Sequence, residues 1–184
     1  MKIIITGHTS NIGKVLFEHL TKSNTCVGFS KSNGFDLNDP SHMQQLIELS
    51  LHGDCLLNLA HIADVQSKIL NHITAKWNIS YPLKNVITFG TLATKINADL
   101  LNTIGIDPLY LKQKQHLDAV HDQCSMQQPF GQQTKFTLLR IANYGQKTGT
   151  RANEPSCSAD DIIKTVDYIL NSDLYISAID LRRI

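Results

Sequence analysis

Residues 2–14, KIIITGHTSNIGK, contain the features that decide the fold of this chain: an apolar run, a glycine-bounded turn and the start of a helix. The consecutive isoleucines at positions 3–5 favour a buried β-strand. After the turn, apolar residues recur at the three- and four-residue spacing of a helix, at Ile12, Val15, Leu16 and Leu20. The stretch therefore predicts a strand over residues 2–6, a turn, and a helix over residues 12–22.

The turn between Gly7 and Gly13 suits a ligand that carries phosphates. Glycine permits a tight turn and a close approach of the backbone to a pyrophosphate, and the N-terminus of the following helix supplies N–H donors. Thr9 and Ser10 add hydroxyl donors. The spacing excludes a P-loop, because one residue too many separates the glycines and no Ser or Thr follows Lys14. An ordinary strand–turn–helix unit without a ligand stays open at this point.

The rest of the chain alternates strands with helices. Apolar runs predict strands over residues 25–30, 34–37, 55–60, 86–89, 136–141 and 175–181, and helical spacing predicts helices over residues 40–51, 63–77, 109–124 and 158–170. Buried strands without alternation, separated by helices, indicate a parallel sheet covered on both faces. We therefore expect a three-layer, doubly wound α/β sheet of about seven strands in a single domain, residues 1–184. Ligands of such sheets bind at the carboxyl ends of the strands.

Composition and charge argue against several other classes of protein. The formal net charge is +1 without a long basic run, so no nucleic-acid partner is expected. No apolar stretch approaches the roughly 20 residues that span a bilayer, so no membrane partner is expected. The chain opens on MKIIITG without the basic and apolar regions of a signal peptide, which predicts a cytoplasmic location. The four cysteines and eight histidines lack the spacing of a zinc site, so no metal is expected.

Several short motifs, in order along the chain, resemble segments of the short-chain dehydrogenase/reductase family, whose fold is the Rossmann fold. The turn is similar to the family's TGxxxGxG, with Asn11 at the middle glycine, and Asn tolerates left-handed backbone. Thr91 stands where the family usually carries a catalytic serine. Further similar segments are residues 36–37 (DL), 58–61 (NLAH), 110–114 (YLKQK), 139–145 (LRIANYG) and 158–162 (SADDI). Their order on the expected elements carries the resemblance.

The resemblance implies hydride transfer between a nicotinamide dinucleotide and a small carbonyl or alcohol, with Tyr110 as the acid/base. Lys114 lies one helical turn from Tyr110, so its charge is expected to favour the phenolate and lower the tyrosine pKa. By resemblance Lys114 would also hold the nicotinamide ribose. Lys112 is two residues from Tyr110 and faces elsewhere, so it is assigned no role. Tyr110 can instead be a core residue at a helix start.

Two further polar roles are implied by the resemblance. Thr91 would hydrogen-bond the substrate oxygen, although it can also be a strand-end cap and Thr94 is a competing hydroxyl. An asparagine on the preceding helix would join a proton relay. Asn71 is our choice and Asn78 is the alternative, and either can be a helix-end residue.

The expected cofactor site draws on several elements. The second strand ends in GFSKS, without the acid that an NAD-preferring site places there, so Lys31 favours NADP(H) over NAD(H). The alternative is that Lys31 is a solvated loop lysine. The expected cofactor-binding residues are Gly7, Thr9, Ser10, Asn11, Ile12, Gly13, Ser30, Lys31, Asp36, Leu37, Asn58, Leu59, Ala60, His61, Lys114 and Asn143.

The chain is a short example of this pattern. The stretch from Asn58 to Thr91 leaves room for one long helix, and only a short polar loop follows Gly145 where relatives insert a segment that covers the substrate. The pocket would then be open, or completed by a second subunit in a homodimer or homotetramer. The shortening favours a non-catalytic, cofactor-binding sensor or scaffold protein, and the retained Tyr–Lys pair favours an enzyme. The motif at 139–145 also leaves a sugar-nucleotide reductase or epimerase open.

Overall fold

The computed structural model describes residues 1–77, 84–96, 105–126, 134–144 and 155–183. These residues form one six-stranded parallel sheet in the order β2-β1-β3-β4-β5-β6. The strands are β1 (Lys2–Thr6), β2 (Thr25–Phe29), β3 (Cys55–Asn58), β4 (Lys84–Thr91), β5 (Thr134–Ile141) and β6 (Ala178–Leu181). The predicted parallel α/β sheet is confirmed, with six strands in the described residues rather than about seven.

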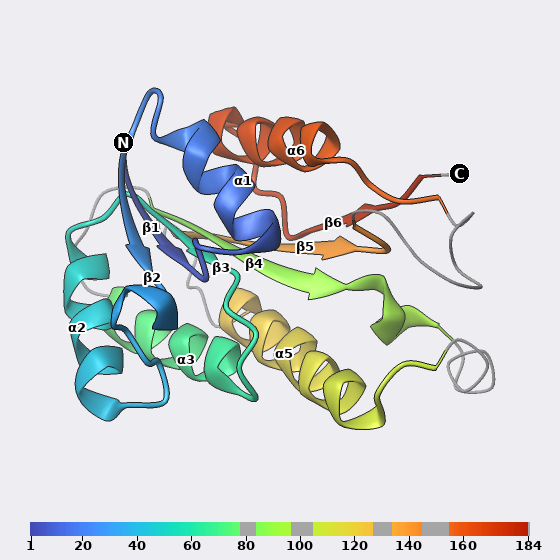
Figure 1. Ribbon diagram of the computed structural model, residues 1–184, viewed down its shortest axis with the longest axis horizontal. Helices are drawn as coiled ribbons and strands as arrows, with labels where there is room; N and C mark the ends of the chain where they lie inside the picture. Colours follow the sequence, from blue (N-terminus) through green and yellow to red (C-terminus); the bar gives the residue numbers. More distant parts are fainter. Residues whose placement is uncertain (78–83, 97–104, 127–133, 145–154, 184) are drawn as a thin grey trace.

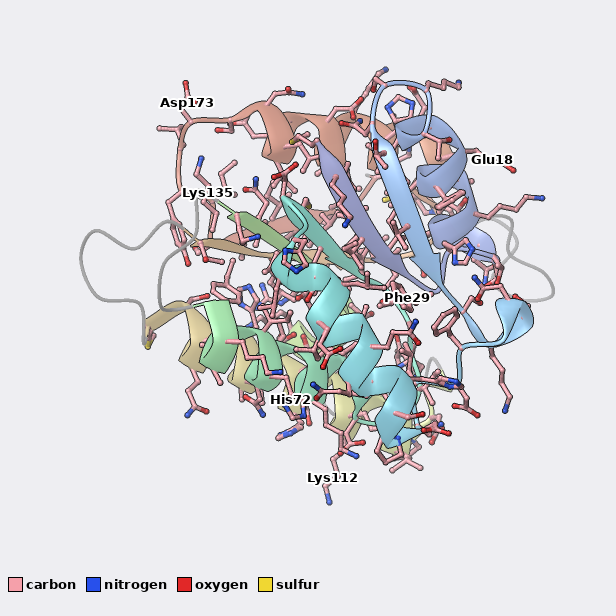
Figure 2. The ribbon with its side chains drawn as sticks, turned by 90° about the vertical axis from the view of Figure 1, so that its left-hand side faces the viewer. Glu18, Phe29, His72, Lys112, Lys135 and Asp173 are labelled. Carbon is pink, nitrogen blue, oxygen red and sulfur yellow. The ribbon has the colours of Figure 1, made fainter. Side chains whose placement is uncertain are left out.

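Helices cover both faces of the sheet, which gives three layers (Figure 1). Figure 2 shows the same layers from the side. One face is covered by α1 (Asn11–Leu20) and α6 (Ala159–Asn171), and the other by α2 (Pro40–Leu51), α3 (Val65–Trp77) and α5 (Pro108–Met126). Two short 3₁₀ helices, η1 (Lys31–Asn33) and η2 (Leu92–Lys95), complete the described helices. Among the described residues no helix has both the length and the hydropathy needed to cross a membrane.

The strand residues explain why both faces are covered. Side chains alternate across a strand, so Ile4 packs under α2 and α3, whereas Ile3 and Ile5 pack under α1 and α6. All three isoleucines are fully buried. An unbroken apolar run is therefore what a strand between two helical layers requires.

The predicted strand over residues 34–37 is wrong. Gly34 has a φ of +92° and turns the chain directly after η1. The backbone that follows hydrogen-bonds locally and not to a strand: the Asp36 N–H donates to Nδ1 of His42 in α2, and the Asn38 N–H donates to the Asp36 carboxylate. The segment therefore leads into α2, and β2 is the edge of the sheet.

The order of the strands defines where a ligand can bind. The chain moves from β1 outward to β2, and then crosses back to place β3 on the other side of β1. Connections leave in opposite directions from neighbouring strands there, which opens a crevice at the carboxyl ends of β1 and β3. The turn after β1 and residues 58–61, at the end of β3, both lie at this switch point.

Candidate active site

The turn after β1 packs tightly enough to require its two glycines. Gly7 has a φ of +73° and donates its N–H to the Phe29 carbonyl over 2.7 Å. A Cβ on Gly7 would lie 3.2 Å from the Ala60 Cα, and one on Gly13 would lie 2.1 Å from the Gly7 carbonyl oxygen. Asn11 has a φ of +47°, so it adopts the left-handed backbone for which its side chain is suited.

The first turn of α1 presents its backbone donors toward the crevice. Ser10 is the N-cap residue in extended backbone, and its side chain makes no capping hydrogen bond. Helix N-termini expose N–H groups and the positive end of the helix dipole, which together favour an anion. The arrangement is therefore suited to a phosphate.

A cavity of about 490 Å³ runs from this turn to α5 along the carboxyl ends of the strands. It brings together the turn after β1 (residues 7–13, here called the phosphate turn), the residues after β3, the ends of β4 and β5, and the first turns of α5. Its lining residues are Gly7, Ser10, Asn11, Ile12, Gly13, Leu59, Ala60, His61, Phe89, Gly90, Thr91, Tyr110, Lys114, Ile141, Ala142, Asn143 and Tyr144. All but six of the expected cofactor-binding residues, together with Tyr110 and Thr91, are in this lining.

Tyr110 lies in the cavity with its phenol close to Thr91. The Lys114 Nζ atom lies 5.9 Å from the centroid of the Tyr110 ring. Burial raises the pKa of Tyr110, and a hydrogen bond with the Thr91 side chain partly offsets that rise. The lowered pKa expected from the sequence is therefore not found, because desolvation of the phenolate outweighs the favourable interactions.

Lys114 is almost fully buried, at 5% exposed, and its ammonium is held by two acceptors. Nζ donates to Oε1 of Gln66 over 2.6 Å and to the Phe89 carbonyl over 3.1 Å. Burial lowers the pKa of Lys114 to about 8, against the opposing effect of Asp118 one turn further along α5. Lys112, by contrast, points away from the sheet into solvent (Figure 2).

Asn71 does not join the site. Its side chain is exposed on α3, and it is not among the residues that line the cavity. The buried stripe of α3 contains Gln66, Ile69 and Ile73, and Gln66 is the polar side chain that reaches Lys114. A glutamine in phase with the apolar positions of that helix was the sequence signal for this residue. The alternative asparagine, Asn78, lies outside the described residues.

The two candidate threonines have different surroundings. Thr91 lines the cavity, and its Oγ1 also accepts a hydrogen bond from the Ala93 N–H over 3.3 Å. Thr94 donates instead to the Thr91 carbonyl and to Asp118 Oδ2. Asp118 also pairs with Arg140 over 2.9 Å. Thr94 therefore belongs to a buried ionic network behind the site, and Thr91 is the hydroxyl that faces the cavity.

His61 adds a titratable ring to the cavity wall. It contacts Tyr110 edge-on, with ring centroids 4.9 Å apart and planes at 81°. Burial and, to a lesser extent, the charge of Lys114 lower the pKa of His61. The imidazole is therefore neutral at pH 7.

A cluster of hydroxyls lies at the end of β2, outside the cavity lining. The Thr9 Oγ1 is 2.6 Å from the Ser30 Oγ and accepts a hydrogen bond from Ser32 over 2.7 Å. Beside them the Lys31 ammonium lies 3.3 Å from the Asp36 carboxylate, and its side chain is exposed. This group combines hydroxyl donors with one cation at the edge of the sheet.

Two expected cofactor-binding residues are buried and do not line the cavity. Asn58 is fully buried, and its Nδ2 donates to the Gln66 carbonyl over 3.0 Å. Leu37 is buried and lines a second cavity of about 360 Å³ between α2 and α3. In the described part of the chain, His, Cys, Asp and Glu side chains form no group that could hold a metal ion.

Comparisons with known proteins give matches of fold. No family model matches the sequence, and no curated protein matches it. A short-chain dehydrogenase from Leptospira borgpetersenii with bound NAD+ has a TM-score of 0.78 at 14% identity, covering 98% of this chain and 91% of that one. A short-chain dehydrogenase/reductase from Veillonella parvula in complex with NADP has a TM-score of 0.66 at 13% identity, covering 97% and 93%.

A third solved structure comes from another class of enzyme. The UDP-N-acetylglucosamine 4-epimerase from Bacillus cereus has a TM-score of 0.71 at 16% identity, covering 100% of this chain and 76% of that one. The chain therefore has the Rossmann fold of the short-chain dehydrogenases/reductases, which confirms at the level of fold the resemblance seen in the sequence.

Proposed function

We propose that the chain is an NADP(H)-dependent oxidoreductase that reduces a small carbonyl, or oxidises the corresponding alcohol, with Tyr110 as the acid/base. The observation that carries the proposal is the cavity that joins the phosphate turn to Tyr110, Lys114 and Thr91. The solved structures with bound NAD+ and NADP support a nicotinamide cofactor. Direct tests are NADPH binding and NADPH oxidation across a panel of small aldehydes and ketones.

The side chains of the cavity match the needs of the reduction. The dinucleotide would supply a hydride to the carbonyl carbon, and the oxygen must then gain a proton. Tyr110 has a raised pKa, so it carries its proton at neutral pH and can donate it. The Thr91 hydroxyl, which lines the same cavity, would hydrogen-bond the same oxygen. Lys114 would donate to the nicotinamide ribose.

The pKa of Lys114 predicts how cofactor affinity depends on pH. Lys114 carries its charge below a pKa of about 8 and loses it above. If the ammonium binds the dinucleotide, the dissociation constant for NADPH is expected to rise about tenfold between pH 7 and pH 9. The pKa of Tyr110 is raised and that of His61 lowered, so neither titrates in this window. Fluorescence titrations from pH 7 to 9 measure the effect, and a flat profile would contradict it.

The choice of NADP(H) rests on the end of β2. Lys31 and the hydroxyls of Thr9, Ser30 and Ser32 could together bind a 2′-phosphate, although Asp36 would first have to release Lys31. Replacement Lys31→Ala is expected to weaken NADPH binding about tenfold and to leave NADH binding unchanged. Lys22→Ala, an exposed lysine after α1, is the control. Equal effects on both dinucleotides would remove the preference.

Two other functions stay open, and a specific observation favours the first of them. Asn143 and Tyr144 of the sequence motif at 139–145 line the cavity, and an epimerase is among the solved structures that match, so a sugar-nucleotide substrate is the second candidate. A non-catalytic dinucleotide-binding protein is the third. Binding of NADPH without oxidation by any carbonyl or sugar nucleotide would favour that third function.

A further inference from the structure

Gln66 is a buried polar residue to which the proposed reaction has so far assigned no role. Its side chain is 2% exposed, and its amide is fully hydrogen-bonded. Nε2 donates to the carbonyl oxygens of Asn58 and Phe89 over 2.7 and 3.2 Å, and Oε1 accepts from Lys114 over 2.6 Å. Because both backbone partners are acceptors, the amide can take only this orientation, with its oxygen toward Lys114.

The same contacts fix the direction of the Lys114 ammonium. An ammonium has three N–H donors, and Gln66 and the Phe89 carbonyl take two of them. The Phe89 carbonyl also accepts from Gln66, so the glutamine and the lysine share one anchor at the end of β4. Since Lys114 lines the cavity, the third N–H is left for that space.

We propose that Gln66 is a positioning residue, which holds the Lys114 ammonium so that one N–H is directed into the cavity toward a hydroxyl of the dinucleotide ribose. The ribose contact rests on the proposed function, whereas the hold on Lys114 does not. A neutral amide suits this role because it aligns the ammonium without neutralising its charge. Asn71, the residue expected from the sequence, cannot take this place from the exposed side of α3.

Few other ionisable groups face Lys114. Tyr110 and Asp118 face it from the same helix, and His61 faces it from the segment after β3. Arg140 on β5 lies beyond Asp118 and is paired with that carboxylate. Asp118 raises the pKa of Lys114, but the carboxylate is bonded to Arg140 and Thr94. Gln66 is therefore the side chain whose loss should change the surroundings of the ammonium most directly.

The test measures Lys114 and cofactor binding separately. Gln66→Met removes the amide at similar volume, and Gln115→Met, at an exposed glutamine on α5, is the matched control. Gln66→Asn, one methylene too short to reach Lys114, serves if the methionine variant does not fold. The pKa of Lys114 is read from the pH dependence of amine labelling, followed at the Lys114 peptide by mass spectrometry. NADPH affinity is read by fluorescence titration in Gln66→Met, Lys114→Met and the double variant.

The expected result has two parts. Loss of the acceptor should lower the labelling midpoint of Lys114, and it should weaken NADPH binding about tenfold in the wild-type background but not in the Lys114→Met background. An unchanged midpoint, or a full-sized loss of affinity when Lys114 is already absent, would overturn the inference. If the wild-type chain binds no dinucleotide, the proposed function and the ribose contact are both overturned, while the midpoint still decides whether Gln66 holds Lys114.

Discussion

Replacement of Tyr110 by phenylalanine is expected to slow NADPH oxidation by an accepted carbonyl substrate about a thousandfold, the size typical of a lost general acid. The ring keeps its contact with His61, which is edge-on and does not involve the hydroxyl. Dinucleotide binding should therefore change little. Steady-state rates of NADPH oxidation and a parallel binding titration measure the two effects independently.

A second tyrosine provides the control for this experiment. Tyr168 on α6 is 57% exposed, so Tyr168→Phe makes the same chemical change away from the cavity and should leave the rate unaltered. Equal rates in the wild type and in Tyr110→Phe would exclude Tyr110 as the acid/base. Retained binding with no rate in either protein would favour a non-catalytic function.

Gly13→Ala is expected to have the other large effect. It should lower the stability of the protein, whereas replacing glycine by alanine in a helix usually raises it. Within a helix this replacement normally stabilises by up to about 1 kcal/mol. Here the new methyl would lie 2.1 Å from the Gly7 carbonyl oxygen, which belongs to backbone and cannot swing aside. The free energy of unfolding should fall by about 1–3 kcal/mol. NADPH binding should weaken about a hundredfold, because the displaced turn loses its hydrogen bonds to phosphate.

The matched control is Gly53→Ala, before the amino end of β3. There the methyl would lie 3.1 Å from the Ile4 Cγ1, a milder clash that involves a side chain and not backbone, and far from the phosphate turn in the strand direction. Denaturant unfolding and NADPH titration of both variants separate a loss of stability from a loss of binding. A Gly13→Ala protein that binds NADPH as tightly as Gly53→Ala would contradict the role given to the turn.

The fold was predictable where the residues that specify an element lie within one short segment. Residues 2–20 combine an apolar run, two glycines and a helical period, and the structure places β1, the turn and α1 there. Asp39 and Ser158 cap α2 and α6, in line with the preference of Asp and Ser for the residue before a helix. The strand predicted over residues 34–37 was wrong because the sequence of four residues does not indicate whether a partner strand lies beside them. The left-handed backbone of Gly34 and the hydrogen bond from the Asp36 N–H to His42 direct this segment into α2 and away from the sheet.

The sequence predicted most residues that line the candidate site, but it did not predict the direction in which the pKa of Tyr110 is shifted. Tyr110, Lys114 and Thr91 reach one cavity because the carboxyl ends of β3, β4 and β5 meet there. The pKa of Tyr110 depends on burial, which sequence spacing does not contain. The phase of Gln66 on its helix indicates that it is buried, but its role could not be predicted because its partners come from three separate elements. The single domain, the cytoplasmic location and the homodimer or homotetramer stay predictions.

The most direct test of the account is titration of the wild-type protein with NADPH and with NADH, followed by fluorescence or calorimetry. The account predicts saturable binding of one dinucleotide per chain, tighter for NADPH, and weakened about a hundredfold by Gly13→Ala. No binding signal from either dinucleotide at millimolar concentration would contradict it.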